Sequence, residues 1–255
     1  MIEDKRLVFD TISQQFDKWR EKYTPELFDF IIKECQLDSS KKCLEIGPGS
    51  GQASDFAINS GCEYTAIELG KNLTELMKAK FGDKENFRII NDDFEKHDFG
   101  NEHYDLIYSA ATIQWINQEI AYKKCFELLN ENGYLAMFRM WDDLKSPNPE
   151  LYEEIQQVYD NHFVSEIPYT CKFDYTKGTD YGYTYLGQFK FYNSRSYTAD
   201  EFSEYIKTHA DHITLKEENR EAFYEGIKTA VRKFGKIHIN STYVLDLYQK
   251  RGTNE

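Results

Sequence analysis

The stretch Cys43-Leu44-Glu45-Ile46-Gly47-Pro48-Gly49-Ser50-Gly51-Gln52 decides the fold. A short apolar run leads into three closely spaced glycines, and apolar residues at helical spacing follow, which predicts a strand, a tight loop and a helix. Glycine permits positive φ and lets a ligand approach the backbone closely. The pattern is typical of an α/β protein whose ligand site lies at the carboxyl end of a parallel strand.

The spacing of the glycines narrows the kind of ligand. A dinucleotide loop has the form G-x-G-x-x-G, but here the order is G-x-G-x-G and Gln52 occupies the place of the last glycine. A P-loop requires a lysine, and this loop has none. Glu45 directly before the loop suits a cation or an ammonium group better than a pyrophosphate. The loop therefore disfavours a nicotinamide-dependent dehydrogenase and a P-loop enzyme.

Around this loop, the hydrophobic period alternates between strand and helix from about residue 25 to 140. Pro25 suits the first position of a helix. The predicted strands cover 42–47, 64–68, 87–91, 104–110 and 134–140. The further predicted helices cover 52–60, 73–81 and 121–129. We expect a three-layer, Rossmann-like α/β fold with a seven-stranded, mostly parallel sheet.

The second half of the chain is less regular. Residues 142–187 are rich in tyrosine, and Pro147, Pro149, Pro168 and Gly182 are expected to break any long element. A strand at 189–192, a helix with a capping box at Thr198, a helix over 217–234 and a last, antiparallel strand over 237–248 follow. We expect one domain over 1–255, with a core at about 25–140 and 188–250, an N-terminal lid segment 1–24 and a lid insertion at about 142–187.

Composition excludes several classes of protein. The 255 residues are 40% hydrophobic and 29% charged, which is ordinary for a globular domain. The net charge of −13 opposes nucleic acid or an anionic membrane as the main partner. No signal peptide or membrane span is evident, so we expect a cytoplasmic protein. The five cysteines are expected to be reduced and structural, and none has metal-ligand spacing.

Two more acidic sites follow the next two predicted strands. Glu68 ends the second strand, where an acid can accept the hydroxyls of a ribose. Asp92 or Asp93 follows the third strand and could accept the exocyclic amine of an adenine, with Phe94 beside the ring. The carboxyl ends of parallel strands share one edge of a sheet, so these acids and the glycine loop are expected to form one site.

Together these features resemble the class I S-adenosylmethionine-dependent methyltransferases. The resemblance continues through 104–111 and 128–135, although Asn130-Glu131-Asn132-Gly133 replaces the usual Lys-Pro-Gly-Gly at a structural turn. It implies S-adenosylmethionine as cofactor and S-adenosylhomocysteine as product. The cofactor-binding residues that it implies are Glu45, Gly47, Gly49, Gly51, Glu68, Leu69, Asp92, Asp93, Phe94 and Ala110.

Two segments are expected on the acceptor side of the site. Residues 16–25 resemble the lead-in of small-molecule methyltransferases that folds over the cofactor, with Arg20 and Tyr23 facing the site; an ordinary amphipathic helix is the alternative. Gln114 and Trp115 resemble the trans-aconitate methyltransferase group, which esterifies a small polycarboxylate. Gln114 is a candidate to bind cofactor or acceptor, whereas Trp115 is expected in the core.

Further candidates are histidines, arginines and tyrosines. His209 and His212 flank Asp211 and are interpreted as structural, at the end of a helix where a partly cationic imidazole meets the helix dipole. Arg20, Arg139 or Arg195 could hold a carboxylate, with surface salt bridges as the alternative. The tyrosines of the insertion could line an acceptor pocket or a dimer surface; they are Tyr152, Tyr159, Tyr169, Tyr175, Tyr181, Tyr183 and Tyr185.

The sequence therefore predicts methyl transfer from S-adenosylmethionine to a small molecule, most readily at oxygen. Positioning can supply about 7–11 kcal/mol of such a reaction's acceleration, so no obligatory base is expected. The catalytic candidates are Tyr23, Gln114 and His209, and the substrate-binding candidates are Arg20, Tyr23, Gln114, Arg139 and Arg195. We expect no metal, and a monomer or homodimer. A catalytically silent cofactor-binding module is the alternative.

Overall fold

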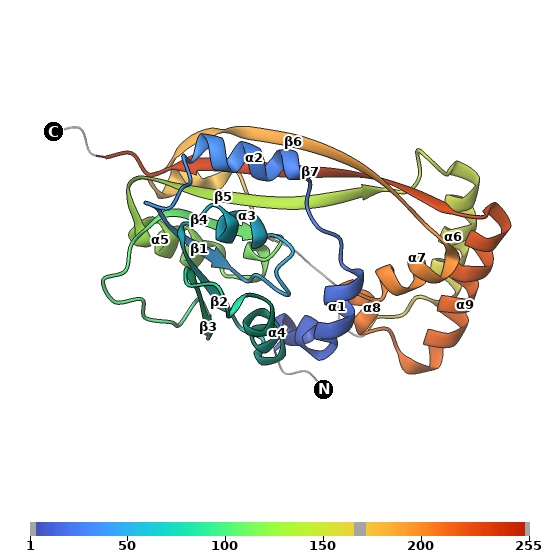
Figure 1. The fold of residues 1–255 in the computed structure, drawn as a ribbon. Coiled ribbons are helices and arrows are strands. Elements are labelled where there is room, and N and C mark those ends of the chain that lie inside the picture. The colour runs from blue at the N-terminus through green and yellow to red at the C-terminus, as the bar shows by residue number, and fades with distance from the viewer. Residues whose placement is uncertain (1–3, 166–171, 253–255) are drawn as a thin grey trace. The chain divides into compact units, whose positions relative to one another are not determined.

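A computed structural model describes residues 4–165 and 172–252 of the chain. Within these residues the strands form a seven-stranded mixed sheet of order β3-β2-β1-β4-β5-β7-β6, in which β7 is antiparallel (Figure 1). Helices flank the sheet. The predicted Rossmann-like fold with an antiparallel last strand is confirmed.

The strand bounds agree closely with the predicted ones in the first half of the chain. The strands are β1 (Lys42–Ile46), β2 (Glu63–Glu68), β3 (Phe87–Asn91), β4 (Tyr104–Ala110), β5 (Leu129–Asp143), β6 (Thr184–Tyr197) and β7 (Ile237–Gln249). β5 and β6 are longer than predicted. The α-helices are α1 (Ser13–Trp19), α2 (Pro25–Glu34), α3 (Asp55–Asn59), α4 (Lys71–Phe81), α5 (Gln118–Leu128), α6 (Pro149–His162), α7 (Ala199–Ile206), α8 (Ala210–Ile213) and α9 (Glu217–Phe234). The 3₁₀ helices are η1 (Lys5–Ile12), η2 (Ile113–Trp115) and η3 (Lys177–Tyr181).

The chain divides into two compact units. The first, here the core unit, comprises Glu21–Met140, Cys171–Phe191 and Tyr243–Glu255. The second, here the helical unit, comprises Met1–Arg20, Trp141–Thr170 and Tyr192–Thr242. Residues 142–187 are thus shared between the units, and their role as a lid stays a prediction.

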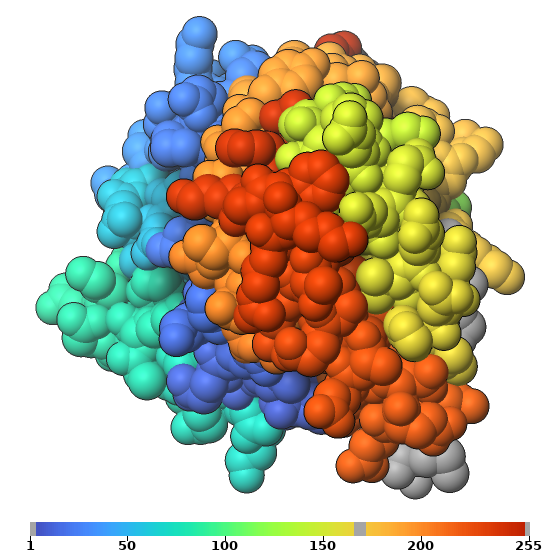
Figure 2. All heavy atoms as spheres, turned by 90° about the vertical axis from the view of Figure 1, so that its right-hand side faces the viewer, coloured from blue at the N-terminus to red at the C-terminus, as the bar shows by residue number. Residues whose placement is uncertain are grey.

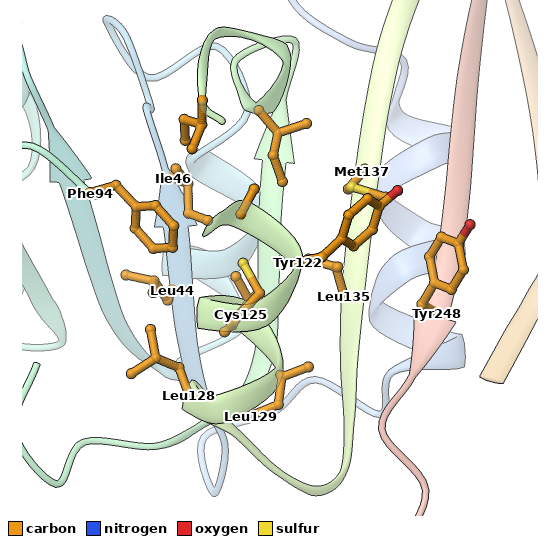
Figure 3. Close-up of a cluster of buried hydrophobic side chains, with 14 of the residues drawn as sticks. Leu44, Ile46, Phe94, Tyr122, Cys125, Leu128, Leu129, Leu135, Met137 and Tyr248 are labelled. Carbon is orange, nitrogen blue, oxygen red and sulfur yellow. The ribbon is translucent and has the colours of Figure 1, made fainter. Parts of the chain in front are cut away.

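Packed side chains cover both faces of the parallel strands in the core unit. Successive side chains of a strand point to opposite faces, so one strand contributes to both apolar clusters. On one face, Leu44, Ile107 and Met137 pack with side chains of α5, and Figure 3 shows Tyr122, Cys125 and Leu128 of this helix facing the strands. On the other face, Tyr108 and Phe138 pack with α2 and α3. Helices on both faces give the predicted three layers.

Part of the tyrosine-rich stretch belongs to the interior of the core unit. Tyr175 and Tyr183 are buried in the cluster around α5. The hydroxyl of Tyr183 donates to the carbonyl of Tyr122 (2.9 Å), and that of Tyr248 donates to the carbonyl of Tyr175 (2.7 Å). Tyr175 and Tyr183 therefore fill the core, while Tyr169 lies outside the described residues.

The helical unit is built on a second apolar cluster. Leu151 and Ile155 of α6 pack with Phe223 and Ile227 of α9, and Figure 2 shows these two helices side by side at the surface, in yellow-green and red-orange. The expectation that prolines break this stretch is wrong at Pro149, because proline at the first turn of a helix loses no hydrogen bond and α6 begins there. The predicted capping box at Thr198 is present and starts α7.

The described residues contain no disulfide, no helix able to span a membrane and no cluster of such side chains able to hold a metal ion. Cys35, Cys43, Cys62 and Cys125 are buried and free of disulfides, and Cys171 lies outside the described residues. Among the helices in the described part of the chain, none is long and apolar enough to cross a membrane. Over the same residues, no group of three or more His, Cys, Asp or Glu side chains could hold a metal ion.

Candidate active site

The glycine loop after β1 has the backbone that its sequence requires. Gly47, Gly49 and Gly51 have φ of 65°, 60° and 92°, values that favour glycine. A Cβ on Gly47 would lie 2.2 Å from Cγ2 of Thr112 in the turn after β4. The Thr112 hydroxyl donates to the carbonyl of Gly47 (2.9 Å). The loop is thus held against the turn after β4, at the carboxyl ends of both strands.

Glu68 lies beside this loop, as the sequence predicts. It is the last residue of β2, and only 7% of it is exposed. Its Oε2 accepts the backbone N–H of Gly49 (3.1 Å), and its Oε1 accepts that of Gly70 (2.8 Å). Two backbone amides from different segments therefore fix the carboxylate at the edge of the sheet.

Glu45 occupies a different position. Its side chain is fully buried, and its Oε2 accepts hydrogen bonds from Ser54 Oγ (2.6 Å), Tyr108 Oη (2.8 Å) and Tyr64 Oη. Its Oε1 has no hydrogen-bond partner among the described residues. Burial raises the pKa of this carboxyl above its ordinary value. Glu45 therefore lies beneath the loop, away from its solvent side.

The turn after β3 brings the remaining acids to the same edge. The N–H of Asp92 donates to the carbonyl of Glu68 (3.1 Å), which joins the turn to β2. The side chain of Asp93 is largely buried and accepts the N–H of Glu95 (3.0 Å). A hydrogen bond from His97 lowers the pKa of the Asp92 carboxyl. The ring of Phe94 is buried in the core (Figure 3).

Two neighbouring backbone positions complete the rim. Leu69 follows Glu68 and is half-buried, and its carbonyl accepts the side-chain amide of Asn91 (3.1 Å). Ala110 ends β4 and lies directly before Ala111, whose φ is +54°. The structure thus brings the predicted loop, Glu68 and the acids after β3 to one edge. Their role in binding a cofactor stays a prediction.

Comparisons with known proteins agree with this arrangement. A family model described as a methyltransferase domain matches residues 44–137. A protein of Anaeromyxobacter dehalogenans described as a type II methyltransferase has a similar fold, with a TM-score of 0.68 at 14% identity over 91% of this chain and 97% of that one. Residues 44–137 of this chain therefore match a methyltransferase domain, and the chain shares its fold with a protein described as a methyltransferase.

The curated relatives match this chain only in part. Ribosomal RNA small subunit methyltransferase A of Pseudomonas putida is 34% identical over 73 residues, or 29% of this chain and 27% of that protein. Malonyl-[acyl-carrier protein] O-methyltransferase 2 of Ilyobacter polytropus is 29% identical over 139 residues, or 47% of this chain and 53% of that protein. The chain thus spans about half or less of the length of these two relatives.

Beyond the loop, two predicted acceptor-side residues are joined through Tyr175, one of the tyrosines that the sequence suggests for an acceptor pocket or a dimer surface. Gln114 donates through Nε2 to the carbonyl of Ala111 (2.9 Å), and its Oε1 accepts the hydroxyl of Tyr175 (2.8 Å). The guanidinium of Arg139 lies over the ring of the same tyrosine, with its Cζ 3.9 Å from the ring centroid. Gln114, Tyr175 and Arg139 therefore form one contiguous cluster, here the acceptor-side cluster.

The acceptor-side cluster shares the sheet edge with the glycine loop. Phe138, the residue before Arg139, pairs with Ala110 in the sheet, and its carbonyl accepts the N–H of Ala111 (2.8 Å). Arg139 binds the buried carboxylate of Asp246 through Nη1. That carboxylate also accepts Tyr185 Oη and Gln188 Nε2, both at 3.0 Å. Asp246 stands in an apolar run of β7, and this placement is the only sequence signal that could have revealed it.

The other predicted acceptor-side residues are engaged elsewhere. Tyr23, in the core unit, packs its ring edge-on against Phe138, with centroids 5.0 Å apart. Arg20 lies at the end of α1 in the helical unit, over the ring of Phe16. Arg195, also in the helical unit, donates through Nη2 to both carboxylate oxygens of Asp142 (2.9 and 3.1 Å). Their part in the reaction stays a prediction.

His209 and His212 differ from the expectation. α7 ends at Ile206, and His209 stands before the short α8, so the pair does not cap the end of the predicted helix. Burial lowers the pKa of His209 well below its ordinary value, which leaves the imidazole neutral near pH 7. His212 is hydrogen-bonded to Asp211 (2.8 Å) and to Tyr159 (2.7 Å). The interpretation as a cationic helix cap is therefore wrong for His209.

Proposed function

We propose that this protein is a methyltransferase that transfers the methyl group of S-adenosylmethionine to an oxygen atom of a small anionic molecule. The observation that carries the cofactor side is the junction of Glu68 with Gly49, which combines a carboxylate and a close backbone approach at one point. Glu68 would accept the ribose hydroxyls, and Asp92 or Asp93 would accept the adenine amine. The glycine loop would hold the methionine end, because glycine leaves the backbone open to a ligand.

When bound, the cofactor supplies an electrophilic methyl group on a positively charged sulfur. The protein has to align an acceptor oxygen with that methyl and exclude water, and such alignment can contribute about 7–11 kcal/mol. A carboxylate is already nucleophilic, so an acceptor of this kind needs no general base from the chain.

The acceptor-side cluster supports an anionic substrate. Among residues 4–165 and 172–252, the only hydrogen bond of Arg139 runs from Nη1 to Asp246, which leaves Nε and Nη2 available to a ligand. The ring of Tyr175 and the Asp246 carboxylate hold the guanidinium in a fixed orientation. A fixed guanidinium edge with spare donors suits bidentate binding of a carboxylate. The name of the partial relative from Ilyobacter polytropus is also that of an O-methyltransferase.

A nucleic-acid acceptor is the second candidate, because one partial relative is named for ribosomal RNA. The net charge of −13 opposes it. The segment Ala111-Thr112-Ile113-Gln114 after β4 also differs from the Asn-Pro-Pro-Tyr motif that serves flipped bases. The small-molecule acceptor is therefore favoured.

The direct test is a panel of carboxylates, phenols, amines and ribosomal RNA incubated with S-adenosylmethionine, with methylated products detected by mass. We expect products from carboxylates. For the best of them, Arg139→Lys should raise KM about tenfold, because lysine keeps the charge but loses the planar fork. Calorimetry measures cofactor affinity, which should be unchanged in this variant. Cofactor binding without any product would identify a silent binding module, and methylated RNA alone would contradict the small-molecule proposal.

A further inference from the structure

The carboxyl of Glu45 is connected to the glycine loop from below. Its Oε2 accepts hydroxyl groups from three elements: Ser54 before α3, Tyr64 of β2 and Tyr108 of β4. The backbone N–H of Ser54 in turn donates to the carbonyl of Gly51, the last glycine of the loop (3.3 Å). The side chain is fully buried, so in this conformation Glu45 reaches the loop through Ser54 and not through a ligand.

In the part of the chain that the structure describes, no cation pairs with the carboxyl of Glu45. The titratable groups that interact with it are the phenols of Tyr64 and Tyr108, the thiol of Cys43 and the carboxylate of Asp55, all of them acids. Its Oε1 is buried and has no partner in the described residues. A buried carboxylate without a cation is costly, so a positive charge brought close to it gains more than it would in water. The binding free energy of a ligand above the loop is therefore expected to depend on the charge of that ligand.

We propose that Glu45 is a positioning residue that makes the site bind the positively charged S-adenosylmethionine more tightly than the neutral thioether S-adenosylhomocysteine. The inference rests on the proposed function, in which the glycine loop holds the methionine end of the cofactor. The two ligands share the adenosine, the ammonium and the carboxylate, and they differ by the methyl group and its positive charge. A carboxylate beneath the loop stabilises that charge before transfer and loses the interaction afterwards, which favours release of the product.

The interaction also predicts a dependence on pH. Only the ionised form of Glu45 attracts the sulfonium, and burial places the pKa of this group above its ordinary value. The ratio of the two affinities should therefore shift toward S-adenosylmethionine as the pH rises through that pKa. The ammonium groups of the two ligands titrate differently, because the sulfonium withdraws electrons, so the same ratio is measured in Glu45→Gln and only the difference between the two proteins is assigned to Glu45. Tyr108→Phe removes a donor from Oε2 and should move the transition to higher pH, because the carboxylate loses a stabilising hydrogen bond.

The test is calorimetric measurement of both dissociation constants for the wild type and for Glu45→Gln. We expect the variant to bind S-adenosylmethionine about tenfold more weakly, which corresponds to about 1.4 kcal/mol, and to bind S-adenosylhomocysteine within about twofold of the wild type. Glu68→Gln is the matched control, because it faces the part that both ligands share and should weaken both equally. As the pH rises, the wild-type ratio should shift toward S-adenosylmethionine relative to the variant's ratio.

Three outcomes separate the possible failures. Equal losses for both ligands in Glu45→Gln would overturn the inference and leave a purely structural role. If that variant does not fold, a pH-independent ratio in the wild type, or a ratio that Tyr108→Phe does not shift, would overturn it instead. Absence of binding of either ligand to the wild type would overturn the proposed function itself.

Discussion

In the helical unit, the carboxylate of Asp142 accepts hydrogen bonds from Arg195, from Tyr205 (2.6 Å) and from Ser241 (2.6 Å). In the core unit, the carboxyl of Glu45, which is more deeply buried, accepts hydrogen bonds only from neutral hydroxyls and keeps one oxygen without a partner in the described residues. The first carboxylate has its countercharge in the protein, whereas the second has none within residues 4–165 and 172–252. A carboxylate paired within the chain points to stability, and a buried carboxylate that lacks a countercharge in the described part of the chain points to a ligand that supplies it.

The same difference separates two arginines. Arg195 donates to Asp142, Ser241 and Tyr197, all within the helical unit. Arg139 of the core unit donates to Asp246, and its other donors have no hydrogen-bond partner in the part of the chain that the structure describes. From sequence alone the two arginines were equivalent candidates. Their surroundings favour Arg139 as the one that binds an acceptor.

The largest expected effect is on stability in the helical unit. Asp142→Ala should lower the free energy of unfolding by about 3–5 kcal/mol, because it leaves the guanidinium of Arg195 nearly buried without its countercharge. Urea denaturation measures this change. Asp160→Ala on the exposed side of α6 is the control and should change stability by less than about 0.5 kcal/mol. A loss below about 1 kcal/mol for Asp142→Ala would mean that the pair does not secure this unit.

The next largest expected effect is on cofactor affinity at the edge of the sheet where the glycine loop and Glu68 lie. Glu68→Ala should weaken the binding of S-adenosylmethionine by about 1–3 kcal/mol, because the ribose hydroxyls lose a charged acceptor. Calorimetry measures it. Glu63→Ala, at the opposite, exposed end of the same strand, should bind the cofactor like the wild type. Unchanged affinity in Glu68→Ala would remove this carboxylate from the cofactor site.

The smallest expected effect is the change of stability with pH that the buried carboxyl of Glu45 causes. The folded pKa of Glu45 lies above its unfolded value of about 4.3, so folding takes up a proton between these two values. The stability that Glu45 contributes is therefore fully present below the unfolded pKa and is lost as the pH rises through the folded pKa. Denaturation of the ligand-free protein from about pH 5 to 8 should show the wild type losing stability relative to Glu45→Gln. If the stability of the wild type relative to Glu45→Gln stayed constant or increased with pH, the Glu45 carboxyl would not be a buried group without a countercharge.

Sequence patterns were sufficient wherever a local signal determines the structure. The strands 87–91 and 104–110 and the helix 217–234 have the predicted bounds. The glycines of the loop have positive φ, as close backbone approach requires. Each of these depends on periodicity or on the freedom of single residues, which neighbouring sequence reveals.

The remaining features depend on contacts between distant parts of the chain. Tyr175 is 61 residues from Gln114, and nothing in its neighbourhood indicates that it bonds this glutamine. Pro149 was expected to interrupt an element because proline breaks the interior of a helix. Proline is tolerated in the first turn, however, and α6 begins at this residue. The resemblance implied that Glu45 binds the cofactor, but the local sequence could not show that its carboxyl is buried against hydroxyls on β2, β4 and the segment before α3.

The most direct test of the central claim is a crystal structure of the protein grown with S-adenosylhomocysteine. We expect the ligand over the glycine loop, with its ribose hydroxyls on the Glu68 carboxylate and the carboxyl of Glu45 still buried beneath. A ligand bound elsewhere, or a loop edge filled by the protein's own side chains, would contradict it.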